Sequence, residues 1–154
     1  MYARIFNPQT SSSYFLFGPR GVGKTSCLKG LYQRSVYIDL LSNQIYNDLR
    51  ARPSRIWDHI PKSYSGPVII DENQKIPSLL DEVHGHMNAD RKRLQFILTG
   101  SSARKLRKAG VNLLAGRARV KSFYPLLAQE LGDDFKLKKA LTYGMLPEVW
   151  VFPD

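Results

Sequence analysis

The amino-acid sequence predicts an α/β fold, a three-layer αβα sandwich in which helices cover both faces of a mainly parallel five-stranded sheet. Three observations predict it. Strand-like and helix-like apolar patterns alternate along the 154 residues. The unbroken apolar run Val68–Ile70 is typical of a strand buried on both faces of a parallel sheet. A glycine-rich segment at residues 17–26 lies between a strand and a helix, at the edge where such sheets bind ligands.

The elements follow from apolar runs and from residues that recur with the helical period. After a lead-in at residues 2–12, we expect five strands, at about residues 13–17, 36–38, 68–70, 96–98 and 118–123. Helical patterns fill the intervals and continue after the last strand, at about residues 25–34, 45–56 with an interruption at Pro53, 76–87, 104–114, 126–131 and 136–143.

The segment FGPRGVGKTS contains the full P-loop pattern, with Gly18 and Gly23 followed by Lys24 and Thr25. Its glycines let backbone N–H groups approach phosphate oxygens. Lys24 can reach the terminal phosphates, the Thr25 hydroxyl can bind Mg²⁺, and the helix N-terminus favours an anion. The sequence therefore predicts a P-loop NTPase fold and a nucleoside triphosphate site, formed by Gly18, Pro19, Arg20, Gly21, Val22, Gly23, Lys24, Thr25 and Ser26.

Two acids end the buried third strand, where the second half of such a site belongs, the Walker B position. Asp71 would hold Mg²⁺ together with Thr25, and Glu72 would orient and polarise the attacking water. The other interpretation of this pair is a cap for the following helix. Thr99 and Ser101 follow the fourth strand and can contact the γ-phosphate or the water, or can simply form a turn.

Arg117 is a candidate to stabilise charge in the transition state, in its own chain or in a neighbouring one. Its spacing alone is equally that of a surface arginine in a basic region. His59, His84 and His86 do not have the spacing of a metal-ligand set, and we expect them to be exposed to solvent.

Composition limits the remaining possibilities. The single cysteine cannot form an internal disulfide, and no apolar run has the length of a membrane span, so we expect a cytoplasmic protein without a membrane partner. Residues 1–90 hold ten Lys or Arg against eight Asp or Glu, whereas residues 91–154 hold thirteen against five. This asymmetry allows contact with nucleic acid or with an acidic partner, and is also that of a solvated basic surface. No Asn-Lys-x-Asp segment is present, which favours ATP over GTP.

The order of these motifs, with LTGSSARKL followed by LLAGRA, resembles a family of prokaryotic AAA-type ATPases of the AAA+ superfamily. The resemblance implies five parallel strands, with the Thr99 strand between the P-loop strand and the Asp71 strand. It also implies that Thr99 or Ser101 takes the sensor position, and it favours the catalytic interpretation of Arg117. Asn73 departs from the small or apolar residue expected after the acid pair.

Members of this family usually join the ATPase core to a C-terminal domain of uncertain function. We therefore expect residues 1–125 to form the core and residues 126–154 to form the start of a truncated helical lid, with the C-terminal domain absent. The leading hypothesis is Mg²⁺-dependent hydrolysis of ATP to ADP and phosphate, with Lys24, Glu72 and Arg117 as catalytic residues, coupled to a protein partner or a homo-oligomer. The alternatives are a nucleotide-binding switch with little turnover, a P-loop small-molecule kinase, and a protein associated with nucleic acid.

Overall fold

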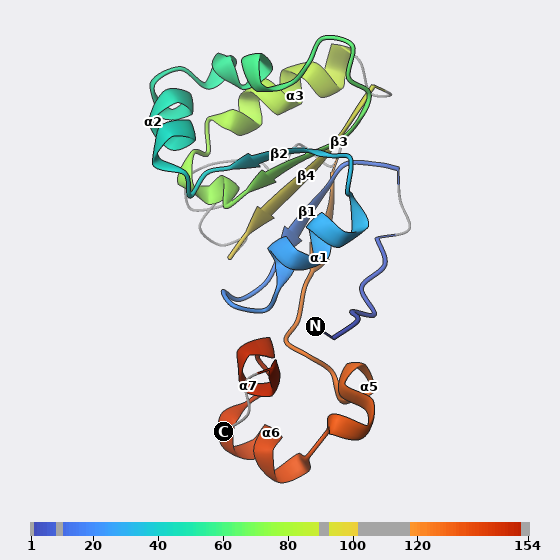
Figure 1. Cartoon of the computed structure of the whole chain (residues 1–154). Coiled ribbons are helices and arrows are strands. Elements are labelled where there is room, and N and C mark those ends of the chain that lie inside the picture. Colours follow the sequence, from blue (N-terminus) through green and yellow to red (C-terminus); the bar gives the residue numbers. More distant parts are fainter. Residues whose placement is uncertain (1, 9–10, 90–92, 102–117, 152–154) are drawn as a thin grey trace.

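The computed structural model describes residues 2–8, 11–89, 93–101 and 118–151. Its centre is a sheet of five parallel strands in the order β2-β3-β4-β1-β5 (Figure 1). The strands are β1 (Tyr14–Phe17), β2 (Val36–Asp39), β3 (Gly66–Asp71), β4 (Leu94–Gly100) and β5 (Arg119–Ser122). The predicted α/β fold is confirmed, and so is the position of β4, which carries Thr99, between β1 and β3.

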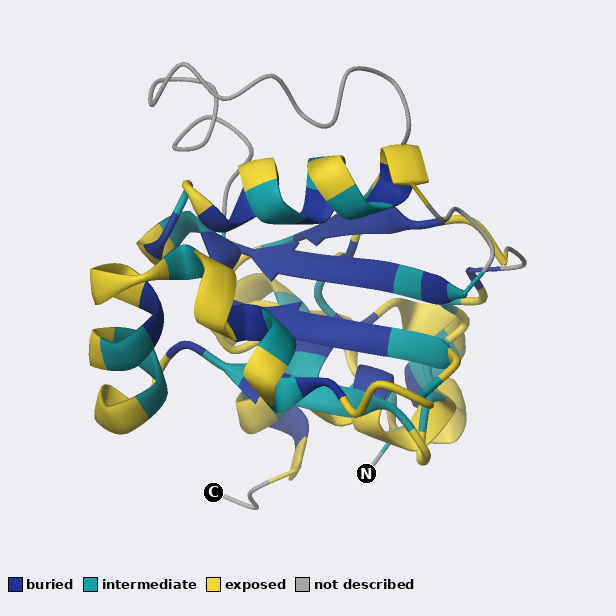
Figure 2. Ribbon diagram, turned by 90° about the horizontal axis from the view of Figure 1, so that it is seen from above, coloured by how far each residue is buried: buried dark blue, intermediate teal, exposed yellow. Residues whose placement is uncertain are grey.

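Helices cover both faces of this sheet. On one face lie α2 (Asn43–Ala51), the 3₁₀-helix η1 (Pro53–His59) and α3 (Leu79–Ala89), and on the other lies α1 (Lys24–Leu31) (Figure 1). Alternate strand residues point to opposite faces, so Phe15 packs toward α2 and α3 while Leu16 packs toward α1. Figure 2 shows the central strands as mainly buried and the outer faces of the helices as exposed, while the edge strand β5 is mostly exposed. The two apolar layers hold the strand ends in fixed positions.

Two details of the α2–α3 layer have local causes. α2 ends at Ala51 and η1 begins at Pro53, because proline cannot continue the hydrogen bonding of a helix but suits the first turn of a new one. The expected exposure of His86 is wrong: its ring lies 4.9 Å from that of Trp57 and 5.9 Å from that of Phe96, measured between centroids. Aromatic neighbours thus keep the imidazole at the surface of the core rather than in open solvent.

The chain after β5 forms a separate small layer of short helices. These are α5 (Ala128–Leu131), the 3₁₀-helix η4 (Gly132–Asp134), α6 (Leu137–Tyr143) and α7 (Pro147–Val151) (Figure 1). Leu126, Leu131 and Trp150 form its own buried cluster. The basic helix expected near residues 104–114 lies outside the described residues. No helix in the described part of the chain is both long and apolar enough to cross a membrane.

Candidate functional site

The loop between β1 and α1 depends on glycine for two different reasons. Gly21 and Gly23 have φ angles of 82° and 89°, a region that residues with a side chain rarely adopt. Gly18 has no space for a side chain, because a Cβ atom there would lie 2.1 Å from the carbonyl oxygen of Phe123. The loop ends at the first turn of α1, where the backbone N–H of Cys27 donates to Gly23 O at 3.0 Å. Such a helix N-terminus presents N–H groups that suit an anion.

Lys24 is a buried cation inside this loop. Its Nζ donates to the carbonyl oxygens of Gly18 and Pro19 at 2.8 and 2.9 Å. Burial lowers the pKa of Lys24, and the negative charges of Glu72 and Asp71 oppose that change. Two neutral acceptors therefore hold the ammonium group, and an anionic ligand can replace them.

Asp71, at the carboxyl end of β3, accepts hydrogen bonds from three hydroxyl groups. Thr25 Oγ1 donates to Asp71 Oδ2 at 2.7 Å, and the Tyr37 hydroxyl donates to the same oxygen. The Thr99 hydroxyl donates to the other oxygen, and its Oγ1 accepts from the backbone N–H of Glu72 at 3.1 Å. Burial and the bond to Asp71 raise the pKa of Tyr37, so its hydroxyl stays protonated as a donor. One carboxylate thus joins β2, β3, β4 and the start of α1.

Glu72 lies in an unusual turn directly after Asp71. Its φ angle is 59°, and it is the one residue other than glycine with a positive φ in the described part of the chain. Such backbone conformations are concentrated at functional sites. The side-chain amide nitrogen of Gln74 donates to the Glu72 carboxylate and lies 3.4 Å from Ser101 Oγ. Asn73, between them, is fully buried, and within the described ranges neither polar atom of its side chain has a hydrogen-bond partner.

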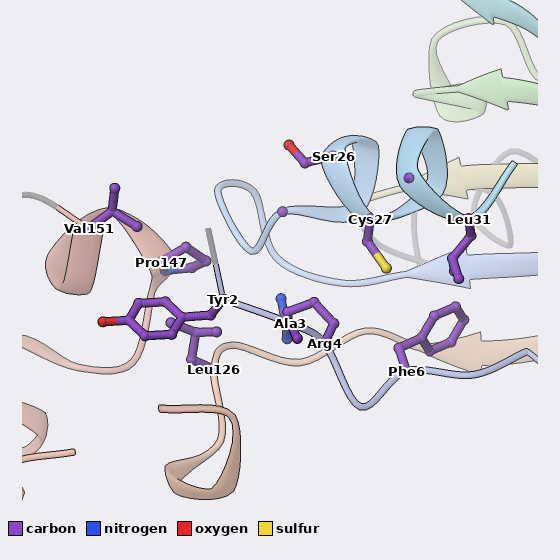
Figure 3. Close-up of a pocket in the computed structure, with 12 residues that line it drawn as sticks. Tyr2, Ala3, Arg4, Phe6, Ser26, Cys27, Leu31, Leu126, Pro147 and Val151 are labelled. Atoms are coloured by element: carbon purple, nitrogen blue, oxygen red, sulfur yellow. The ribbon is translucent and has the colours of Figure 1, made fainter. Parts of the chain in front are cut away.

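A cavity of about 480 Å³ opens beside the P-loop. Figure 3 shows Ser26, Cys27 and Leu31 on α1 at one side, the N-terminal segment (residues 2–8) below them, and α7 beyond it. Its walls are mostly apolar, and the lining residues are Tyr2, Ala3, Arg4, Phe6, Gly23, Ser26, Cys27, Gly30, Leu31, Leu126, Pro147 and Val151. This size and lining are typical of sites for small organic ligands. Burial raises the pKa of the Cys27 thiol, which keeps it protonated at the cavity wall.

Arg4 connects the N-terminal segment to the P-loop and to the C-terminal helices through hydrogen bonds and an ion pair. Its guanidinium donates to Val22 O at 2.6 Å and to Tyr124 O at 2.7 Å. Its Nε donates to Glu130 Oε1 at 3.0 Å, and both side chains of this ion pair are nearly buried. The guanidinium also lies over the Phe123 ring, 4.3 Å from the centroid. Through Arg4, the N-terminal segment that lines the cavity is therefore hydrogen-bonded to the P-loop.

The structure brings most of the sequence-predicted site residues together at one edge of the sheet. Thr25, Asp71 and Thr99 are in direct contact, whereas Arg20 is exposed on the outside of the loop. Arg117 lies outside the described residues. Sequence reasoning did not identify Tyr37 or Gln74. The two-residue periodicity of β2 offered a signal for Tyr37, because Asp39 pairs with Asp71 in the register and Tyr37 lies two residues earlier on the same face.

The lining of the cavity was also missed, since its N-terminal part was interpreted as a lead-in and α7 was not predicted. No local pattern marks such a wall, because its residues come from three segments that are far apart in the sequence: residues 2–6, residues 23–31 and residues 126–151.

Comparison with models of protein families agrees with this geometry. The AAA domain family matches residues 10–132, a range that includes the P-loop, the acid pair and β4. A search of curated proteins found no match. Among solved structures, PCH-2 of C. elegans is similar, with 25% identity and a TM-score of 0.46 over 71% of this chain. The chain spans 33% of that PCH-2 chain. Because the family match covers most of the sequence, the chain belongs to the AAA domain family and is a nucleotide-binding ATPase module.

Proposed function

We propose that this module binds ATP and hydrolyses it to ADP and phosphate in a Mg²⁺-dependent reaction. The observation that carries the proposal is the 2.7 Å contact between Thr25 of the P-loop and Asp71 of β3, with Glu72 as the next residue. This contact joins a loop suited to phosphate with a carboxylate suited to a cation. It also leaves a second carboxylate beside them for the attacking water.

The phosphates of ATP would lie along the N–H groups of residues 18–26. The Lys24 ammonium group would then donate to phosphate oxygens instead of the carbonyl oxygens of Gly18 and Pro19. Its hydrogen bonds would become stronger, because the new acceptors carry negative charge. The adenosine part would occupy the neighbouring cavity, which shares Gly23 and Ser26 with the loop and is walled mainly by apolar side chains. One ligand would thus fill the loop and the cavity together.

The donor set fits Mg²⁺. A hydroxyl and a carboxylate oxygen already lie 2.7 Å apart, on Thr25 and Asp71, and Mg²⁺ prefers oxygen ligands, completing its coordination with phosphates and water. When bound, the ion would neutralise charge that develops on the phosphates. Tyr37 and Thr99 hold the Asp71 carboxylate in one orientation from the neighbouring strands.

In the hydrolytic step, a water oxygen would bond to the γ-phosphorus while the bond from that phosphorus to the bridging oxygen breaks. The electron pair of the broken bond leaves with ADP, and Glu72 accepts a proton from the water. Arg117 is proposed to balance the charge of the transition state, from its own chain or from a neighbouring copy. Thr99, near the end of β4, and Ser101, which follows it, are proposed to respond to the γ-phosphate.

We further propose that residues 1–125 are the ATPase core and that residues 126–154 form the beginning of a helical lid. The process that uses the energy would involve a protein partner, and Leu137, Leu141 and Tyr143 on α6 offer exposed apolar surface to one.

Phosphate release and ATP binding, measured separately, test this function. Lys24→Ala is expected to abolish ATP binding, with Lys62→Ala, an exposed lysine, as the matched control. Glu72→Gln is expected to keep ATP affinity and to lower phosphate release by roughly 10²–10⁴-fold, the usual contribution of a general base. Its control is Asp81→Asn, an exposed acid on α3.

Equal background release from the parent and Glu72→Gln would reject hydrolysis and leave a binding switch. Phosphate that appears on an added metabolite instead of in solution would indicate a kinase.

A further inference from the structure

We propose that Gln74 is a positioning residue for ATP hydrolysis: its amide nitrogen holds the Glu72 carboxylate, and its carbonyl oxygen accepts a hydrogen bond from the attacking water. This inference rests on the proposed ATPase function. It adds Gln74 to the acid pair as a second residue that orients the attacking water. It follows from the contacts of Gln74, from the burial of its carbonyl oxygen, and from the position of its side chain beside the end of β4.

The orientation of the Gln74 amide follows from its neighbour. An ionised carboxylate can only accept hydrogen bonds, so the amide nitrogen has to face Glu72. The same nitrogen lies 3.4 Å from Ser101 Oγ, which follows β4. Gln74 therefore links the acid to the neighbouring strand end and restricts the rotation of the Glu72 side chain.

This orientation leaves the carbonyl oxygen of Gln74 available as an acceptor. The atom is buried and has no hydrogen-bond partner among the residues that the structure describes, which is unfavourable unless a donor is supplied. It lies against Gly100, where an added Cβ atom would be 2.4 Å from it. The carbonyl oxygen of Gly100 accepts from Gly18 N at 3.2 Å, so the free acceptor lies next to the start of the P-loop.

A single water can satisfy both acceptors. One of its O–H groups would donate to Glu72 and the other to the Gln74 carbonyl oxygen, which directs an oxygen lone pair away from both. When that lone pair bonds to the γ-phosphorus, the bond to the bridging oxygen breaks and its electrons leave with ADP. The proton facing Glu72 moves to the carboxylate, and the O–H facing Gln74 remains on the released phosphate.

The backbone supports this arrangement. Glu72 has its positive φ of 59°, and Lys75 N donates to Glu72 O at 2.9 Å. This turn lets Gln74, two residues later, reach back to the carboxylate. A tight turn that costs energy and brings two polar side chains together is consistent with a functional role.

Gln74→Leu removes both polar atoms and keeps a similar volume. We expect kcat for phosphate release to fall at least about tenfold, with KM and the Kd for ATP within about twofold of the parent, because the step affected follows binding. In the Glu72→Gln background the same change is expected to cost much less, since the two residues act as a unit. Gln44→Leu, an exposed glutamine on α2, is the matched control. An unchanged kcat, or a rise in KM and Kd that explains the loss, would overturn the proposal.

A second measurement does not depend on turnover. Hydrogen exchange of the Gln74 side-chain amide, followed by NMR, is expected to be at least about tenfold slower in the parent than in Glu72→Ala, because the carboxylate holds that group. Equal exchange rates would overturn the positioning contact. A parent that exchanges slowly but releases no phosphate would instead reject the proposed hydrolysis and retain the contact between the two residues.

Discussion

The two ends of the candidate nucleotide site are built in opposite ways. The phosphate end consists of short continuous segments, residues 18–26, 71–74 and 99–101, which meet at the carboxyl edge of a buried parallel sheet. The cavity end is walled by the N-terminal segment, α1 and α7, and several of its residues are partly exposed. At the first end a chain of hydrogen bonds fixes individual atoms. At the second end apolar side chains enclose a volume.

This difference follows from what each end has to recognise. Charge on phosphate and water has to be met by donors and acceptors at fixed positions, and strand ends supply such positions better than loops. A flat apolar group needs enclosure more than exact contacts, so short helices and an extended segment suffice. Substitutions at the two ends are therefore expected to differ in the size of their effects.

The largest effect is expected from Gly18→Ala at the phosphate end. The new methyl group would meet the backbone oxygen of Phe123 at 2.1 Å, and a backbone cannot move aside as a flexible side chain can. We expect a loss of about 3 kcal/mol in the free energy of unfolding, the upper end for overpacking. Urea denaturation measures the stability, and calorimetry is expected to show no ATP binding.

Gly30→Ala is the matched control for that change. Gly30 lies in α1, and an added Cβ atom would have no neighbour within 4 Å. The same substitution is expected to stabilise the protein by about 1 kcal/mol, since alanine favours a helix over glycine. Equal losses at the two positions would show that replacing glycine by alanine, rather than the close approach of Phe123 to residue 18, sets the cost.

Arg4→Met would break the connection between the two ends. It removes the bonds to Val22 and Tyr124 and leaves Glu130 as a nearly buried charge, whose side chain is only 3% exposed. Breaking such a pair commonly costs 3–5 kcal/mol. We expect about 2 kcal/mol, below that range, because backbone N–H groups still donate to Glu130.

Arg55→Met is the control for Arg4, because Arg55 pairs with Asp48 at the surface, where its side chain is 51% exposed. Exposed pairs contribute little, so we expect less than about 1 kcal/mol. ATP affinity is expected to fall in Arg4→Met and to stay unchanged in Arg55→Met. Equal affinity in both variants would show that the N-terminal segment does not take part in binding.

Asn73→Leu, at the phosphate end of the site, is expected to stabilise the protein, unlike the substitutions above that destabilise it. The buried amide of Asn73 has no partner in the described part of the chain, so a leucine, which has the same branched skeleton of heavy atoms, removes two unsatisfied polar atoms. We expect a gain of about 1 kcal/mol in thermal or urea denaturation, with unchanged ATP affinity. A loss of stability would mean that the amide forms bonds in solution.

The smallest expected effect is on how stability depends on pH, and it comes from Glu130, the partner of Arg4. Burial alone would raise the pKa of Glu130, but the N–H groups of Leu127 and Ile5 and the charge of Arg4 lower it below its ordinary 4.5. A carboxyl whose folded pKa is depressed contributes stability above its unfolded pKa and loses it as pH falls through the folded pKa. Unfolding free energy is therefore expected to fall below about pH 4.5 less steeply in Glu130→Gln than in the parent. Identical slopes would contradict this.

The sequence predicted the phosphate end of the site better than the cavity end. The contact between Thr25 and Asp71 was predictable, because a P-loop and an acid-ended buried strand each have a local pattern. Resemblance to AAA-type ATPases supplied the position of the Thr99 strand between the P-loop strand and the Asp71 strand, which no local pattern encodes. Tyr37 and Gln74 were missed, since their roles depend on which strand ends lie next to one another. The exposure of His86 was mispredicted because its aromatic neighbours are distant in the sequence.

The hydrogen bond from the Tyr2 hydroxyl to the carbonyl oxygen of Trp150, at 3.3 Å, has a consequence for biosynthesis. A ribosome releases the P-loop, the acid pair and β4 well before α7, and chains generally begin to fold from the N-terminal side as they emerge. The sheet edge with the P-loop and the acid pair can therefore assemble during translation, while the N-terminal segment must wait for α7 before the two can enclose the cavity. A nascent chain of this protein would therefore complete the P-loop edge of the sheet before it completes the cavity beside that edge.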